Sequence, residues 1–124
     1  MKTKILEPTK ENITYAGRLL AEGGIVAFPT ETVYGLGADA FNEEAVKAVY
    51  AAKGRPSDNP MIVHIARASD IGQLTLRLSG DIVALIENFW PGPLTMVVKK
   101  KPGILDATTG GLDTVGIRLP DTQI

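Results

Sequence analysis

Hydrophobic positions recur with helical spacing in three segments of the chain. In residues 12–22 an apolar side chain falls on one face at every third or fourth position, and a glycine pair follows, as is typical of a helix end. Residues 42–53 form a second helical segment that starts at Asn42, a good N-cap, and residues 81–89 form a third that a Pro-Gly-Pro run ends. A weaker helical patch is predicted at 70–73, where Asp and Gln have capping-box spacing.

Short runs rich in β-branched and apolar residues lie between these helical segments. They predict strands at 25–28, 61–66, 94–98 and 114–119. The run at 61–66 is nearly all apolar, which is typical of a strand covered on both faces. Because strands alternate with helices, we expect an α/β fold with a mixed, largely covered sheet. A chain of 124 residues with 44% hydrophobic residues forms one core, so we expect a single domain over residues 1–124.

Charge and composition exclude several classes of function. Thirteen Lys plus Arg residues nearly cancel 14 Asp plus Glu, so the chain lacks the basic field of a dedicated nucleic-acid binder, and any anion site must be local. The absence of cysteine excludes disulfides, thiolate metal sites and cysteine nucleophiles, and favours a reducing compartment. No stretch has the length of a signal-peptide core or a membrane span, so we expect a cytoplasmic protein without membrane contact.

Two loops concentrate polar side chains. Residues 29–37 place two threonines, a glutamate and a tyrosine between a proline and two glycines, which suits either a small-molecule site or a hairpin-like turn. In the second loop, 53–60, Lys53 and Arg55 flank a glycine and could clamp phosphate oxygens, or could only favour the negative end of the preceding helix. The loop lacks the Walker A spacing. The residues alone leave both alternatives open in each loop.

Two polar residues lie inside predicted strands. His64, the single histidine, is interpreted as either a structural group or a ligand-binding residue, and it has no partners for a metal site or a Ser-His-Asp triad. Strand alternation sets Arg118 on the face opposite to its apolar neighbours, where it needs an anionic partner from the protein or a ligand. The remaining segments are interpreted as a rigid turn at 89–95, a solvated strand end at 99–101 and a mobile glycine loop at 108–114.

Four stretches together resemble the YrdC/Sua5 family of threonylcarbamoyl-AMP synthases. They are residues 27–37 (AFPTETVYGLG), 53–60 (KGRPSDNP), 90–95 (WPGPLT) and 115–120 (VGIRLP). They occur in family order and at family spacing, and the resemblance covers essentially the whole chain. It implies a YrdC/RibB-like fold, an open twisted mixed sheet flanked by helices, with a concave and locally basic face.

The resemblance also implies an enzyme of the nucleotidyltransferase class. Such an enzyme uses ATP and Mg²⁺ to join L-threonine and bicarbonate into threonylcarbamoyl-AMP, and it releases pyrophosphate. The product serves threonylcarbamoylation of adenosine 37 in tRNAs that read ANN codons, so tRNA and the threonylcarbamoyl transferase complex are implied partners. Some members of the family bind double-stranded RNA.

Residue roles are carried over position by position from the family. The implied ATP-binding residues are Lys53, Arg55, Asn59 and Thr114. Lys53 and Arg55 are also the implied catalytic residues. The implied threonine-binding residues are Thr32, His64 and Arg118, with Arg118 as a bidentate donor to the carboxylate. No residue is implied as a metal ligand.

The chain departs from the family after residues 115–120. Family members continue to a Ser-x-Asn segment that completes the nucleotide site, whereas this sequence stops at Ile124. We therefore expect a C-terminally incomplete YrdC-like domain that is weakly active or inactive by itself. Two other functions stay open, an RNA-binding module without catalysis and a carbamoyl-adenylate domain of a hydrogenase-maturation or O-carbamoyltransferase protein.

Overall fold

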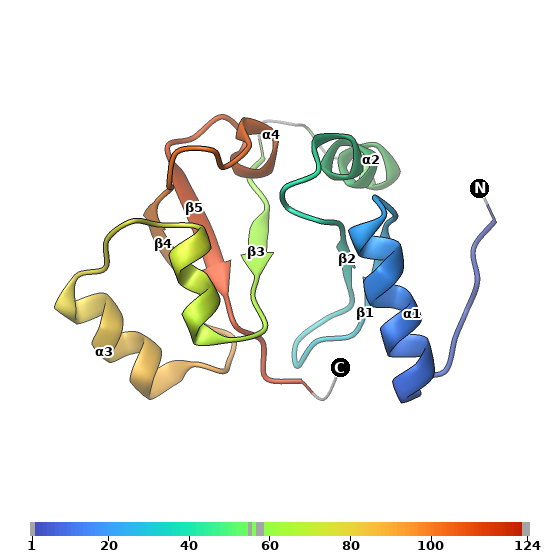
Figure 1. The fold of residues 1–124 in the computed structure, drawn as a ribbon, viewed down its shortest axis with the longest axis horizontal. Helices are drawn as coiled ribbons and strands as arrows, with labels where there is room; N and C mark the ends of the chain where they lie inside the picture. Colours follow the sequence, from blue (N-terminus) through green and yellow to red (C-terminus); the bar gives the residue numbers. More distant parts are fainter. Residues whose placement is uncertain (1, 55, 57–58, 123–124) are drawn as a thin grey trace.

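The computed structural model describes residues 2–54, 56 and 59–122 of the chain. In chain order the elements are α1 (Lys10–Ala21), β1 (Val26–Phe28), β2 (Gly35–Gly37), α2 (Glu43–Lys53), β3 (Ile62–His64), the short 3₁₀ helix η1 (Ala68–Gln73), α3 (Gly80–Phe89), β4 (Met96–Lys99), α4 (Asp106–Thr109) and β5 (Thr114–Arg118). Helices and short strands alternate along the chain, and the predicted α/β fold is confirmed (Figure 1).

The three longer helices begin where a polar side chain caps the first turn. Thr9, Asn42 and Ser79 each accept a hydrogen bond from the backbone N–H three residues on, at 3.1, 3.1 and 3.3 Å respectively. Gly54 ends α2 in the left-handed conformation, with φ of 63°. The predicted helices at 12–22, 42–53 and 81–89 agree with the observed helices within two residues at each end.

The strands form two sheets. β1 and β2 pair in antiparallel orientation, so residues 29–34 are the loop of a hairpin, as one of the two interpretations of this segment proposed. β5 is the middle strand of a three-stranded mixed sheet, parallel to β3 and antiparallel to β4. The register sets His64 beside Arg118 at the carboxyl ends of the two parallel strands. The predicted mixed sheet is therefore present.

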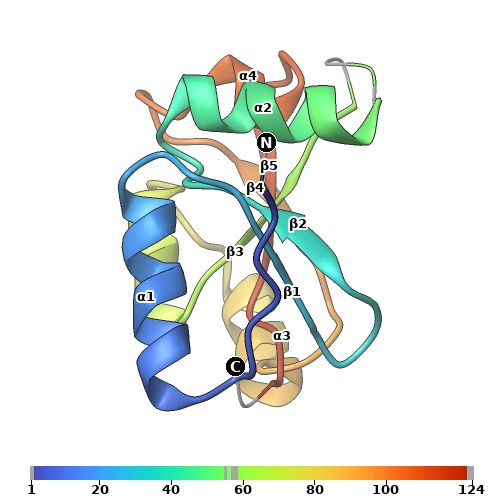
Figure 2. The ribbon, with the colours of Figure 1, turned by 90° about the vertical axis from the view of Figure 1, so that its right-hand side faces the viewer.

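The helices α1, α2 and α4 lie beside different parts of the two sheets. Figures 1 and 2 both show α2 and α4 together at one end of the molecule, whereas the loop of the β1–β2 hairpin and the carboxyl end of β5 lie toward the other end. α1 packs beside β1. One end of the sheets is therefore bordered by α2 and α4, and the other end is bordered by the hairpin loop.

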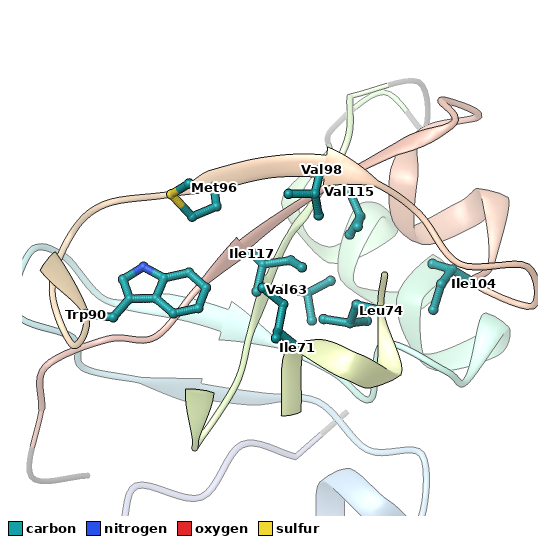
Figure 3. Packing of buried hydrophobic residues seen from close by; sticks show 9 residues of the cluster. All are labelled: Val63, Ile71, Leu74, Trp90, Met96, Val98, Ile104, Val115 and Ile117. Carbon is teal, nitrogen blue, oxygen red and sulfur yellow. The ribbon is translucent and has the colours of Figure 1, made fainter. Parts of the chain in front are cut away.

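The hydrophobic core lies on one face of the three-stranded sheet (Figure 3). Its buried members are Val63, Ile71, Leu74, Trp90, Met96, Val98, Ile104, Val115 and Ile117. Ile117, at the centre of β5, is 0% exposed. Trp90 is anchored in this core because its indole Nε1 donates a hydrogen bond to the Leu94 carbonyl at 2.8 Å, which confirms the predicted rigid turn at 89–95.

The predicted cover on both faces of residues 61–66 is wrong. The strand is short, and Val63 is buried in the core while Ile62, on the other face, is 53% exposed. That other face borders a cleft rather than a helix. An apolar run does not reveal which of its faces a helix covers.

The predicted mobile loop at 108–114 is also wrong in its first part. Thr108 and Thr109 belong to α4 and are each 1% exposed, and the Thr108 hydroxyl donates to the Ala40 carbonyl at 2.7 Å. Lys100, predicted to be solvated, bonds Asp106 at 2.6 Å and the Thr109 hydroxyl at 3.0 Å. These partners come from elsewhere in the chain, so local composition could not show them.

The weak helical patch near residue 70 forms the 3₁₀ helix η1, which begins before Asp70 rather than at it. The Asp70 carboxylate accepts the backbone N–H of Arg67 at 3.2 Å and so stabilises the first turn. Among the described helices, none combines the length and the apolar character that crossing a membrane requires.

The core makes a direct prediction about stability. Ile117→Ala should lower the free energy of unfolding by about 2–5 kcal/mol, because it leaves a cavity in a packed strand. Val97 lies on the neighbouring strand β4 and is 65% exposed, so Val97→Ala should cost less than about 1 kcal/mol. Urea unfolding measures both values, and equal losses would contradict this description of the core.

Candidate active site

A cleft of about 770 Å³ lies between the β1–β2 hairpin and the strands β3 and β5. Apolar residues of both sides line it together with a few polar groups. The polar side chains that border it are those of Thr30, Thr32, Tyr34, Asp39, Lys53, His64, Asp70, Gln73, Thr108 and Arg118. A cleft of this size, with few convergent polar groups, suits a nucleotide-sized ligand.

The cleft is polar at both of its ends. Lys53 is the last residue of α2, at the end of the molecule that α2 and α4 occupy (Figures 1 and 2). His64 and Arg118 lie at the carboxyl ends of β3 and β5, toward the hairpin loop. Ligands of open α/β folds bind outside the carboxyl ends of strands, which favours this part of the cleft as a binding site.

Arg118 is buried, and two parts of the chain hold its guanidinium. Its Nε donates to the Gly92 carbonyl at 3.3 Å, and its Nη2 forms an ion pair with the Glu31 carboxylate. The side chains are 11% and 22% exposed respectively, so water screens this pair far less than a surface pair. The anionic partner that the sequence required of Arg118 is therefore Glu31 in this structure.

The hairpin loop is organised by Thr30. Its hydroxyl donates to the Val33 carbonyl at 2.6 Å, and it lies 3.1 Å from the Thr32 hydroxyl. The backbone N–H of Thr32 also points to the Thr30 hydroxyl at 3.3 Å. These bonds fix the turn and place the exposed Thr32 at the border of the cleft.

His64 is a half-buried imidazole in the cleft wall. The ring of Phe28 meets it edge-on, with centroids 5.9 Å apart and an interplanar angle of 71°. Burial lowers the pKa of His64 below its ordinary value of 6.5, because desolvation disfavours the charged form. At neutral pH the imidazole is therefore uncharged and offers one donor and one acceptor.

Four of the seven site residues named from the sequence border this single cleft. They are Thr32, Lys53, His64 and Arg118. Asn59 and Thr114 are not among the described residues that line it, and Arg55 lies outside the described residues. Asn59 precedes β3, and its carbonyl accepts the Tyr50 hydroxyl at 2.5 Å, while Thr114 is the first residue of β5.

Sequence reasoning missed Glu31 as a functional candidate. The polar residues of loop 29–37 suit a small-molecule site, but they do not assign its carboxylate to Arg118. The signal was present, since a buried strand arginine requires an anion and Glu31 is the only acidic residue of that loop. Glu31 and Arg118 are 87 positions apart, however, and the chain has 14 Asp and Glu residues. Only the fold shows which of these carboxylates meets Arg118.

Among residues 2–54, 56 and 59–122, no three His, Asp or Glu side chains are grouped to hold a metal ion. Asp39 and Asp70 both border the cleft, but Asp39 caps the backbone N–H of Phe41 at 3.0 Å and Asp70 is engaged in η1.

Comparison with protein families places the chain in a known class. The sequence model of the Sua5_yciO_yrdC family, described as "Telomere recombination", matches residues 18–124. The chain belongs to this Sua5/YciO/YrdC family. The resemblance inferred from the four stretches is thereby confirmed.

Particular relatives carry a more specific name. The threonylcarbamoyl-AMP synthase of Bacillus subtilis is 52% identical over 120 residues, which are 96% of this chain and 35% of that protein. The enzyme of the same name from Pyrococcus abyssi is 49% identical over 112 residues, or 90% of this chain and 33% of that protein. A structure of P. abyssi Sua5 complexed with L-threonine is similar with a TM-score of 0.90 and 46% identity, over 95% of this chain and 35% of that one.

The chain spans about a third of the length of these curated relatives. The fold and the family are therefore shared over nearly the whole chain, whereas the relatives extend well beyond the matched region.

The state of His64 leads to a testable prediction about pH. Because the folded state lowers its pKa, the unfolded chain binds the proton more readily below pH 6.5. The contribution of His64 to stability is thus full above pH 6.5, and it is lost progressively as the pH falls from 6.5 to the lower folded pKa. His64→Gln should remove this part of the pH dependence between pH 8 and 5, as measured by urea unfolding.

Proton NMR provides the direct measurement, because His64 is the single histidine of the chain. Its ring protons should titrate with a midpoint below 6.5 in the folded protein and near 6.5 in urea. A folded midpoint above 6.5 would mean that the imidazole has an anionic partner and that burial does not dominate.

Proposed function

We propose that the chain carries the site of an L-threonylcarbamoyladenylate synthase, which converts L-threonine, bicarbonate and ATP into threonylcarbamoyl-AMP and pyrophosphate. The observation that carries this proposal is the arrangement of the cleft, with a lysine at one end and a neutral histidine beside a held arginine at the other. Such a cleft suits a phosphate-bearing ligand and an amino acid side by side. Relatives of this name and a related protein solved with L-threonine support it.

The threonine would bind near the hairpin loop. Arg118 offers a planar donor to its carboxylate, and Thr32 and the neutral His64 offer hydrogen bonds to the amine or the hydroxyl. Burial strengthens the contact with Arg118, because the surroundings of this side chain exclude water.

The nucleotide would bind toward the α2 end of the cleft. Lys53, Asn59 and Thr114 all belong to segments at that end, namely the end of α2, the chain entering β3 and the start of β5. Thr114 is four residues before Arg118 on the same strand, about 13 Å at ~3.3 Å per residue. The proposed nucleotide-binding residues near Thr114 and the proposed threonine-binding residues near Arg118 are therefore separated by about the length of an adenylate. We assign Arg55 to the nucleotide group from its place in the sequence.

The chemistry is consistent with residues of these kinds. The amine of threonine and bicarbonate condense to a carbamate with loss of one water molecule. A carbamate oxygen then attacks the α-phosphorus of ATP while the bond to the pyrophosphate breaks and pyrophosphate leaves. Lys53 and Arg55 would stabilise the charge that builds on the phosphoryl oxygens, and fixed orientation of the two substrates supplies much of the remaining acceleration. The carbamate is already anionic, so the attack needs no dedicated general base.

The wider setting is part of the same proposal. In this proposal, residues 1–124 form a single YrdC-like domain. A transferase complex uses the product for threonylcarbamoylation of tRNA. The reaction takes place in the cytoplasm. Mg²⁺ would arrive with ATP, since it is usually held by substrate phosphates and water with few protein ligands. The described residues therefore need no carboxylate cage for it.

The nucleotide side is tested by substitution of its cations. In a form of the protein that also carries the region by which the relatives extend beyond the match, Lys53→Ala and Arg55→Ala should each lower pyrophosphate release from threonine, bicarbonate and ATP by about 100-fold or more, the usual loss for one contact to developing charge. Lys47 lies on the same helix and is exposed in a surface pair with Glu43, so Lys47→Ala is the matched control and should retain activity. Turnover near that of the parent chain in both variants would exclude this assignment.

The threonine side is tested at Arg118. Arg118→Lys keeps the charge but loses the planar fork, so the KM for threonine should rise about tenfold or more, while the KM for ATP stays within about twofold. Circular dichroism serves as the check that the variant is folded. A raised KM for ATP with an unchanged KM for threonine would move Arg118 to the nucleotide side.

A further inference from the structure

Glu31 connects the hairpin loop to the end of the central strand. Its carboxylate forms the ion pair with Nη2 of Arg118, and its second oxygen accepts the backbone N–H of Asp121. Asp121 follows β5 after two residues. One carboxylate therefore fixes both the side chain at the end of β5 and the backbone just beyond it.

Glu31 holds Arg118 from outside the cleft. Thr30, Thr32 and Arg118 border the cleft, but Glu31 is not among its lining residues. The carboxylate therefore contacts the guanidinium without lining the ligand space. A side chain that occupied the ligand position itself would line the cleft.

The contacts of Arg118 leave one edge of its guanidinium for a ligand. Nε is bonded to the Gly92 carbonyl, and Nη2 is paired with Glu31. Nη2 is buried and makes no hydrogen bond besides this ion pair, and within the described part of the chain no hydrogen bond of Nη1 is found either, so the edge formed by Nη1 and Nη2 keeps N–H donors for a ligand. Gly92 is itself fixed, because its N–H donates to the Leu119 carbonyl at 2.8 Å. The free edge is thus presented by a guanidinium that is held at two other places.

We propose that Glu31 is the positioning residue of the carboxylate subsite, and that it selects a single carboxylate over more highly charged anions. The inference rests on the proposed function, because the ligand carboxylate is that of threonine. A guanidinium held in advance loses less freedom when the ligand binds. Its charge is already compensated, so it offers directed hydrogen bonds without the excess positive charge that would attract phosphate or pyrophosphate.

The opposite role for Glu31 would be that of a competitor which must leave Arg118 before the ligand binds. The two roles predict opposite changes in the KM for threonine when the Glu31 carboxylate is removed. Removal of a competitor lowers the KM for threonine, whereas removal of a positioning group raises it. Because Glu31 does not line the cleft, the structure favours positioning.

Glu31→Gln is the sharpest variant, since the amide keeps the shape and an acceptor for Asp121 but loses the charge. The KM for threonine should rise about tenfold, as expected for the loss of a charged contact, with the KM for ATP within about twofold. Inorganic phosphate or sulfate should become a competitor of threonine in this variant and not in the parent chain. Glu43→Ala removes an exposed carboxylate of a surface pair and is the control that should change none of these values.

A double-mutant cycle shows whether Glu31 acts through Arg118. Glu31→Gln should have little further effect on the KM for threonine when Arg118 is already Ala, because the group that it positions is gone. An effect of full size in that background would overturn the inference, and so would an unchanged or lowered KM in the single variant.

NMR of the Arg118 side chain separates this inference from the proposed function. In the ligand-free chain, the Nε–H signal of Arg118 should be that of an ordered group, and Glu31→Gln should make it mobile. If calorimetry shows that the parent chain binds no threonine, the proposed function is wrong and so is the ligand named here. The NMR comparison needs no ligand, so it still decides whether Glu31 holds Arg118. Equal order of the side chain in the two proteins would overturn the positioning role.

Discussion

The central strand β5 is paired along both edges, and this constraint governs the rest of the structure. Because β3 and β4 occupy its backbone, the side chains of β5 can only point to the two faces of the sheet. Val115 and Ile117 enter the core on one face, so Arg118 must lie on the other. A cation buried there requires partners, and the structure brings them from two segments far away in the chain, the hairpin loop with Glu31 and the turn with Gly92.

Much of the fold could be predicted from local pattern. The three longer helices follow the N-caps Thr9, Asn42 and Ser79, whose hydrogen bonds are local in sequence, so the ends of these helices need no tertiary information. The buried members of β5 also followed from alternation. What the sequence could not show was long-range pairing, such as the Thr108 hydroxyl on the Ala40 carbonyl, which turns a glycine-rich stretch into part of an ordered element.

Some residues of the candidate site could likewise be predicted from the sequence, whereas the role of others is visible only in the fold. His64 and Arg118 could be singled out because polar residues inside apolar strands are unusual, and the parallel register of β3 and β5 puts them side by side. Lys53 lies at a helix end, where a cation is stabilised even without a ligand, so sequence alone left its role open. The fold favours a role in binding, because it turns this residue toward the same cleft as Arg118.

The turn at 89–93 shows how residues without titratable groups set the geometry of the site. The indole of Trp90 is buried and bonded to the Leu94 carbonyl, which fixes the turn on the core. A side chain at Gly92 would place its Cβ 2.7 Å from the Phe89 carbonyl oxygen, closer than real Cβ atoms come, so glycine is required there. Its N–H bonds Leu119 and its carbonyl accepts from Arg118, so both of its polar groups hold the end of β5. A stretch that resembles the family but does not line the cleft can therefore be as necessary for the site as the residues that line it, because it fixes the direction in which the arginine points.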